Sequence, residues 1–201
     1  MAADRCGPDE FYDINYARAK AAGIRVGPYH RAFVGGNGPA GVRANAKFEA
    51  KVFIDEVGGL RGRDLRPALD VETPFASLSA TELRIWVRTW LKRVRRALHA
   101  KPIIYTNASS WSALGNPRSF ALKGHALWVA NWNVRSPAVP ADNWAGRGWR
   151  IWQHSSTGHV RRINGNVDLD WLRGKWRKVS IRRAGGSNAG GLSAAPAATQ
   201  G

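Results

Sequence analysis

Two carboxylates stand two positions apart at the end of an apolar run, in the segment Pro67-Ala68-Leu69-Asp70-Val71-Glu72-Thr73. Side chains alternate along a strand, so Asp70 and Glu72 project from one face if this segment is extended. Two acids held close together cannot both ionise freely, which separates their pKa values and leaves one protonated while the other is charged. Glycoside hydrolysis needs that division of labour. Two solvated acids at a strand end are the alternative interpretation.

Further polar and aromatic side chains follow the other predicted strands, and Asp168 adds a third candidate catalytic carboxylate. Aromatic rings cover the apolar faces of sugars while their polar tips form hydrogen bonds. Core packing is the alternative for each tryptophan, and a structural role is the alternative for His30 and His154. The candidate substrate-binding residues are Tyr29, Tyr105, Trp128, Trp132, Trp152 and Gln153.

Strands and helices alternate in the pattern that must position these residues. Helices are predicted over 13–22 and 41–56, and a third begins after Ser79, where Glu82 completes a capping box. Strands are predicted over 24–33, 65–71, 102–106, 126–130, 150–154 and 166–169. This alternation predicts an α/β fold with a parallel sheet. If the sheet is a barrel, substrate meets the carboxyl ends of the strands, where the candidate residues cluster.

The chain is long enough for one domain, which we expect over residues 1–176, followed by a basic, Gly- and Ala-rich disordered tail over 177–201. A single cysteine, Cys6, excludes an intrachain disulfide. We find neither an apolar run of transmembrane length nor a hydrophobic signal core after Met1. His and Asp residues show no tight metal-ligand spacing, so neither a metal nor a cofactor is expected.

The formal charge of +17 predicts an anionic partner. Nucleic acid, an anionic cell-wall polymer and an anionic membrane surface are all consistent with this charge. Part of it lies beyond residue 174, where several basic residues stand without an acid. Composition alone does not choose between these partners.

Two C-terminal segments resemble the signature of glycoside hydrolase family 25 lysozymes, the Chalaropsis-type N-acetylmuramidases. They are I-W-Q-H-S-S-T-G from Ile151 to Gly158 and G-N-V-D-L-D from Gly165 to Asp170. In that family a W-Q-Y-S-S-x-G segment leads into a G-x-V-D-L-N run. The resemblance covers about residues 9–174 and also includes 22–30, 67–72, 102–107 and 127–130, in order and at plausible spacing.

The resemblance implies a modified TIM-like β/α barrel that cleaves the β-1,4 bond between N-acetylmuramic acid and N-acetylglucosamine in peptidoglycan. By analogy Glu72 is the general acid and Asp70 orients or stabilises an intermediate formed with help from the substrate acetamido group. Asp168 completes the acidic floor. The implied partners are peptidoglycan glycan strands and anionic wall polymers, with no dedicated nucleic-acid partner. A monomer acting outside the cell or in the cell wall is expected.

The N-terminal region departs from the family pattern. Family 25 domains begin with a strand carrying G-x-D-V-S, whose Asp lies in the active site, and a second strand follows. Neither is found before Phe11, so we expect an incomplete barrel of six strands that lacks the first two. Two unpaired edges would then be exposed. A misassigned start, an inactive remnant and a peptidoglycan-binding module without turnover are the three explanations, and a basic nucleic-acid-binding protein is a further alternative.

Overall fold

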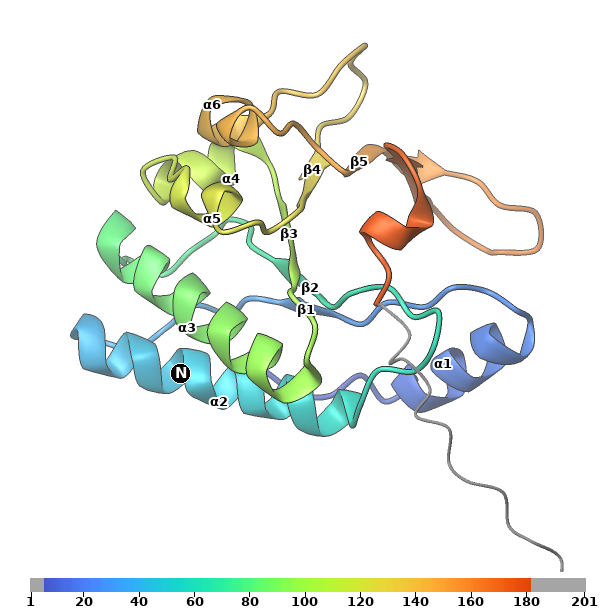
Figure 1. The fold of residues 1–201 in the computed structure, drawn as a ribbon, viewed down its shortest axis with the longest axis horizontal. Helices are drawn as coiled ribbons and strands as arrows, with labels where there is room; N and C mark the ends of the chain where they lie inside the picture. Colours follow the sequence, from blue (N-terminus) through green and yellow to red (C-terminus); the bar gives the residue numbers. More distant parts are fainter. Residues whose placement is uncertain (1–5, 182–201) are drawn as a thin grey trace, which may run out of the picture.

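Six strands follow one another in chain order across one curled sheet, from β1 at one edge to β6 at the other (Figure 1). The computed structural model describes residues 6–181. The strands are β1 (Tyr29–Arg31), β2 (Ala68–Asp70), β3 (Ile103–Thr106), β4 (Leu127–Ala130), β5 (Ile151–Gly158) and β6 (Val167–Leu172). Pairing is parallel from β1 to β5. Within the described residues the sheet forms a half-barrel that does not close, as expected from the sequence.

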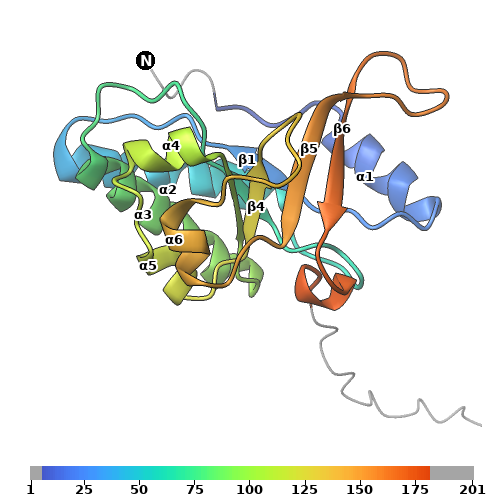
Figure 2. The ribbon, with the colours of Figure 1, turned by 90° about the horizontal axis from the view of Figure 1, so that it is seen from above.

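Helices precede each of the strands β1 to β5 along the chain. They are α1 (Tyr12–Ala21), α2 (Gly38–Val57), α3 (Ala80–Leu98), α4 (Ala108–Ala113), α5 (Ser119–Leu122) and α6 (Pro140–Ala145), followed by the short 3₁₀ helix η2 (Trp176–Lys178). Helices α2 and α3 pack side by side (Figure 1). Figure 2 shows α4, α5 and α6 grouped on one side of β4, with the β5–β6 hairpin on the other. Across residues 6–181, no helix has both the length and the apolar character that crossing a bilayer requires.

Helix α3 confirms the sequence pattern in detail. The Ser79 hydroxyl accepts a hydrogen bond from the Glu82 amide, and the Glu82 carboxylate accepts one from the Ser79 amide at 2.9 Å, so the predicted capping box is present. Its apolar stripe packs against α2 and the sheet. The buried members of the stripe are Leu83, Trp86, Val87, Trp90, Leu91, Val94 and Leu98.

Two element predictions need correction. The last strand pairs antiparallel with β5, because the connection over 159–166 is too short for the crossover that a parallel strand requires. The first predicted strand, 24–33, is regular only over Tyr29–Arg31.

The chain continues to pack against the domain beyond residue 176, where the sequence predicted the boundary. Val179 is fully buried, and its carbonyl accepts a hydrogen bond from the Arg66 amide at 2.7 Å. Ser180 forms an isolated antiparallel bridge with Leu65. Residues 177–181 therefore belong to the domain, and the remainder of the predicted tail, 182–201, lies outside the described residues.

The two faces of the sheet pack into two separate hydrophobic cores. Leu69, Val71 and Ile104 point outward into the main core beneath α2 and α3. Ala68 and Ile103 point inward, where they pack with Val179 in a second, smaller core. This inner core fills the end of the half-barrel at which the parallel strands begin. Polar residues occupy the next inward positions, toward the ends of those strands.

Candidate active site

Strand register aligns four side chains in one row across the inner face of the sheet. Arg31 on β1 pairs with Asp70 on β2, Asp70 with Tyr105 on β3, and Tyr105 with Trp128 on β4. Residues that are paired across parallel strands project to the same side. On β2 and β3, the residue in this row is the next inward-facing residue after the one in the small apolar core. The small core therefore packs directly beneath the row.

Asp70 is a buried carboxylate without its full set of hydrogen bonds. Its residue is 7% exposed, and no described group donates a hydrogen bond to Oδ1. The pKa of Asp70 is raised to about 7, chiefly by burial and then by the negative charge of Glu72, while the positive charge of Arg31 opposes both effects. A carboxyl group with this pKa exchanges its proton near neutral pH, which suits acid–base chemistry.

Glu72 lies just beyond the strand end, closer to solvent. Its side chain is 19% exposed, and Arg31 Nη1 lies 3.4 Å from its Oε2. One backbone and one side-chain hydrogen bond hold Val71, the residue that precedes Glu72. The Val71 amide donates to the Tyr105 carbonyl at 2.9 Å, and the fully buried Thr106 hydroxyl donates to the Val71 carbonyl at 2.8 Å.

Tyr105 lies at the centre of the row and connects the two halves of the site. Its hydroxyl donates to Gln153 Oε1 at 3.0 Å, and Trp132 Nε1 donates to the same oxygen at 2.9 Å. Burial raises the pKa of Tyr105 well above its usual range, and the negative charges of Glu72, Asp70 and Asp168 add to this effect. The three predicted catalytic carboxylates therefore all lie near enough to Tyr105 to disfavour ionisation of its hydroxyl.

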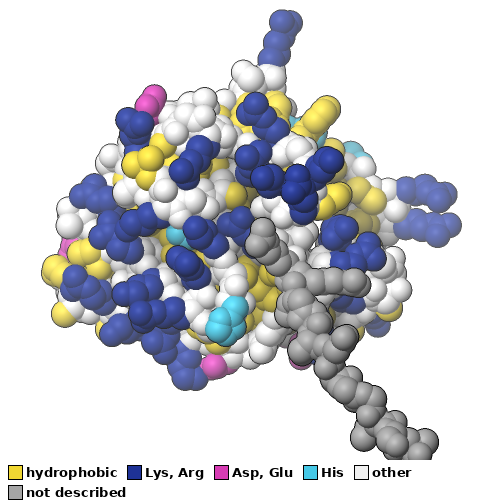
Figure 3. Space-filling view, in the orientation of Figure 1, with side chains coloured by type: hydrophobic (Ala, Val, Ile, Leu, Met, Phe, Trp, Pro, Cys, Tyr) yellow, Lys and Arg dark blue, Asp and Glu magenta, His cyan; other side chains and the backbone are white. Residues whose placement is uncertain are grey.

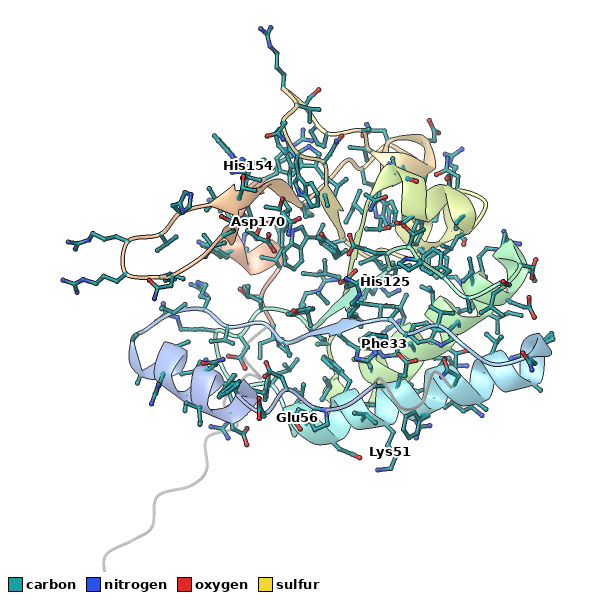
Figure 4. The ribbon with its side chains drawn as sticks, turned by 180° about the vertical axis from the view of Figure 1, so that it is seen from behind. Phe33, Lys51, Glu56, His125, His154 and Asp170 are labelled. Carbon is teal, nitrogen blue, oxygen red and sulfur yellow. The ribbon has the colours of Figure 1, made fainter. Side chains whose placement is uncertain are left out.

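The β5–β6 hairpin supplies a further carboxylate. Trp128 Nε1 donates to Asp170 Oδ1 at 2.6 Å, and the Trp128 ring meets the edge of Tyr105 at a centroid distance of 5.1 Å. Figure 4 places Asp170 and His154 together on this hairpin. Asp170 is not among the candidate catalytic residues that the sequence predicted, although it stands two positions after Asp168 and so shares its face of β6. The same two-residue spacing that marked Asp70 and Glu72 could have identified it.

Two of the predicted sugar-binding aromatics stand apart from this row. Trp152 precedes Gln153 on β5 and therefore faces the opposite side, where its indole packs against Trp149 and donates to the Asn131 carbonyl at 2.8 Å. The structure does not bring Trp152 to the inner face. Tyr29 is paired with Ala68, one layer below Asp70, and is 67% exposed at the edge of the sheet.

Sequence comparison matches residues 5–163 to the family described as glycosyl hydrolases family 25. The chain belongs to this family. It is 33% identical over 174 residues to lysozyme M1 of Streptomyces globisporus, covering 83% of this chain and 55% of that protein. It is also 30% identical over 132 residues to the N,O-diacetylmuramidase of Chalaropsis sp, covering 60% of this chain and 61% of that enzyme.

Solved structures agree with this assignment. The bacterial lysozyme from Streptomyces coelicolor superimposes with a TM-score of 0.72 at 31% identity, covering 85% of this chain and 77% of that one. The family 25 member described here spans about half the length of the curated relatives that it matches first. The family assignment therefore concerns the half-barrel described here, whose residues 5–163 match the family.

Proposed function

We propose that this family 25 domain is a muramidase, which hydrolyses the β-1,4 bond between N-acetylmuramic acid and N-acetylglucosamine in peptidoglycan. The observation that carries the proposal is the buried Asp70 carboxylate, with an oxygen that has no partner, next to the more exposed Glu72. The names of the relatives, lysozyme and N,O-diacetylmuramidase, support this substrate class.

Glu72 is the proposed general acid, because it lies nearer to solvent at the mouth of the row. Its proton passes to the glycosidic oxygen as the bond to the anomeric carbon breaks. The ion pair with Arg31 must open for Glu72 to carry that proton, and the bound glycan would take the place of the guanidinium. A water molecule then attacks the anomeric carbon and returns a proton to Glu72.

Asp70 is proposed to act on the acetamido group of the sugar rather than on the leaving group. Its unpartnered Oδ1 can accept the acetamido N–H, which turns the acetamido oxygen toward the anomeric carbon. That oxygen forms the new bond as the glycosidic bond breaks, and water later opens the resulting ring. A buried acceptor without a donor is costly in the free protein, so this hydrogen bond also contributes to substrate binding.

The remaining inner-face residues would bind the glycan. Trp132 is 46% exposed and can stack against a sugar ring, while Trp128 and Tyr105 form the wall behind it. Gln153 accepts two hydrogen bonds through Oε1, which orients its amide group for a sugar hydroxyl. Asp168 is exposed on β6 and would contribute charge at the rim of the site.

A basic face would bring the protein to an anionic cell wall. Figure 3 shows Lys and Arg side chains gathered over one side of the molecule. A hollow there is lined by Arg66, Arg95, Lys101, Arg177 and Lys178, and none of these residues forms an ion pair in the described part of the chain. It lies where the strands begin, at the opposite end from Asp70 and Glu72. Anionic wall polymers could therefore bind without blocking the site.

Release of soluble fragments from purified cell walls tests this function. The wild-type chain, Glu72→Gln and the surface control Glu10→Gln are compared at equal concentration. We expect release by the wild type and the control, and a loss of at least about 100-fold in Glu72→Gln, the range that acid catalysis contributes. Folded wild-type protein that binds walls without releasing fragments would refute the proposal in favour of a binding module.

An activated substrate tests the role of Glu72 separately. A dinitrophenyl glycoside has a leaving group that needs no proton, so Glu72→Gln should retain a much larger share of activity on it than on cell walls. Asp70→Asn should lose activity on both substrates, because the acetamido group must still attack. Equal losses for Glu72→Gln on the two substrates would contradict its assignment as the acid.

A further inference from the structure

Three potential metal ligands from distant parts of the sequence meet beside β1. They are Cys6 in the segment before α1, His30 in the middle of β1 and Glu49 in the middle of α2. One ligand atom of each lies within 4.8 Å of the others. A thiolate, an imidazole nitrogen and a carboxylate oxygen are all ligands that zinc uses in proteins. The wide separation of the three in sequence explains why no ligand spacing was found in the chain.

Glu49 has a buried carboxylate oxygen that is available to a cation. The residue is fully buried, its Oε2 lies 2.9 Å from His30 Nε2, and it also accepts the Phe33 amide at 3.0 Å. The other oxygen, Oε1, is buried and has no hydrogen-bond partner in the described part of the chain. A buried carboxylate that keeps an unsatisfied oxygen is destabilising unless a cation or a donor reaches it.

The histidine is held in place as a ligand should be. Its ring stacks on Trp90 with a centroid distance of 5.5 Å and an interplanar angle of 16°, and the ring of Phe53 packs at 5.8 Å. Phe33 follows on the extended segment that runs along α2 (Figure 4). A ring fixed by packing loses little entropy when it binds a metal.

This cluster is separate from the candidate active site. Neighbouring residues on a strand face opposite sides, so His30 points away from the inner face on which Arg31 approaches Glu72. A ligand at the cluster would therefore lie on the α2 side of β1. Loss of such a ligand need not disturb the inner row directly.

The spacing suits a tetrahedral ion after a small adjustment. Zinc bonds of about 2.0–2.3 Å place neighbouring ligand atoms roughly 3.3–3.7 Å apart. Here His30 Nε2 and Glu49 Oε2 are 2.9 Å apart, and no pair of ligand atoms exceeds 4.8 Å. Cys6 stands in a segment without regular secondary structure, so it can move by the ångström that binding needs.

A role for Cys6 as a free nucleophile fits less well. The pKa of the Cys6 thiol is raised to about 11, chiefly by burial and then by the negative charge of Glu49. Without a cation the sulfur is thus protonated at neutral pH, and a thiol is a weak nucleophile. A bound divalent cation reverses this effect by stabilising the thiolate.

We propose that Cys6, His30 and Glu49 bind one zinc ion, with water in the fourth position. The ion would link the segment before α1 to the edge strand β1 and to α2. These elements otherwise enclose a cavity of about 420 Å³, which is lined by Cys6, His30 and Phe53 among others. Zinc would stabilise the open edge of the half-barrel and would take no part in the proposed glycan hydrolysis.

Metal content and a cobalt spectrum test the site in the full chain. After incubation with zinc and dialysis, the wild type should retain one zinc per chain by mass spectrometry. Cys6→Ser should bind zinc at least about 10-fold more weakly, while His159→Gln, which alters an exposed histidine, should bind like the wild type. Cobalt in the wild type should show a sulfur-to-metal charge-transfer band that Cys6→Ser lacks.

Thermal unfolding gives a readout that does not depend on activity. Saturating zinc should raise the Tm of the wild type and the control by several degrees, and should leave the Tm of Cys6→Ser within about 1 °C. Glu49→Gln is a second variant, and retention of its fold is checked by circular dichroism. Wild-type protein that retains no zinc, or equal binding by Cys6→Ser, would overturn the proposal.

Discussion

Replacing Asp70 with asparagine should stabilise the protein at alkaline pH and leave its stability unchanged in acid. The pKa of Asp70 is raised from 3.8 to about 7 in the folded chain, chiefly because the carboxyl group is buried. Between these two values the folded state retains a proton that the unfolded state has released. The free energy of unfolding therefore falls as the pH rises through this window, and the loss is complete above pH 7.

The size of the effect follows from the shift. A change from 3.8 to about 7, at 1.36 kcal/mol for each pH unit, corresponds to about 4 kcal/mol. Asparagine does not titrate, so Asp70→Asn should be more stable than the wild type by about this amount at pH 8 and by roughly nothing at pH 4. For a domain of this size the gain corresponds to a rise in Tm of about 10 °C.

Thermal unfolding followed by circular dichroism at several pH values between 4 and 8 measures this difference. Asp142→Asn is the matched control, because the Asp142 side chain is 72% exposed and its replacement should change the Tm little at any pH. The Asp70→Asn variant should also lose cell-wall release, so that stability and activity change in opposite directions. A Tm difference that is the same at pH 4 and pH 8, or a destabilised variant at pH 8, would refute the reasoning.

Three further predictions concern groups around this carboxylate. Arg31→Gln removes the cation that lowers the pKa of Asp70, so the alkaline loss of stability should move to higher pH in the same unfolding series. Thr106→Val removes a buried 2.8 Å hydrogen bond to the Val71 carbonyl, which should cost about 1–2 kcal/mol by urea unfolding and lower kcat more than it raises KM. Trp132→Ala changes a residue that is 46% exposed, so the Tm should fall by no more than about 3 °C while cell-wall affinity falls several-fold in a pull-down assay. An unchanged pH dependence for Arg31→Gln, an unchanged stability for Thr106→Val, or an unchanged cell-wall affinity for Trp132→Ala would contradict the corresponding role.

Local patterns predicted the regular elements well where one physical effect dominated. The apolar stripe and capping box of α3 appear as expected, because burial on one face and a satisfied N-terminus are both encoded in neighbouring residues. The apolar run before Asp70 also forms a strand as predicted, and the register of β2 places Asp70 on the inner face of the sheet. The antiparallel β6 was missed because the alternation of elements suggested a parallel sheet, although the short connection before it could have indicated a hairpin.

The site could be predicted only in part, because its remaining features depend on contacts between distant segments. The sequence pointed to Asp70, Glu72 and Tyr105, but not to the approach of Arg31 from another strand. Trp152 and Gln153 are neighbours on β5, so they face opposite sides of the sheet. Only the structure shows that Trp152 packs against the main core and that Gln153 faces inward toward Tyr105. The meeting of Cys6, His30 and Glu49 has no local signal at all, since it depends on how α1, β1 and α2 pack.

Analysis of the reducing ends of the cell-wall fragments tests the central claim most directly. Purified peptidoglycan is digested with the wild-type chain and with Glu72→Gln, the products are reduced with borohydride, and the sugar alcohols are identified by mass spectrometry. A muramidase that uses Glu72 predicts reduced N-acetylmuramic acid in the wild-type digest and none above background with the variant. Reduced N-acetylglucosamine, or equal product from both proteins, would contradict the account.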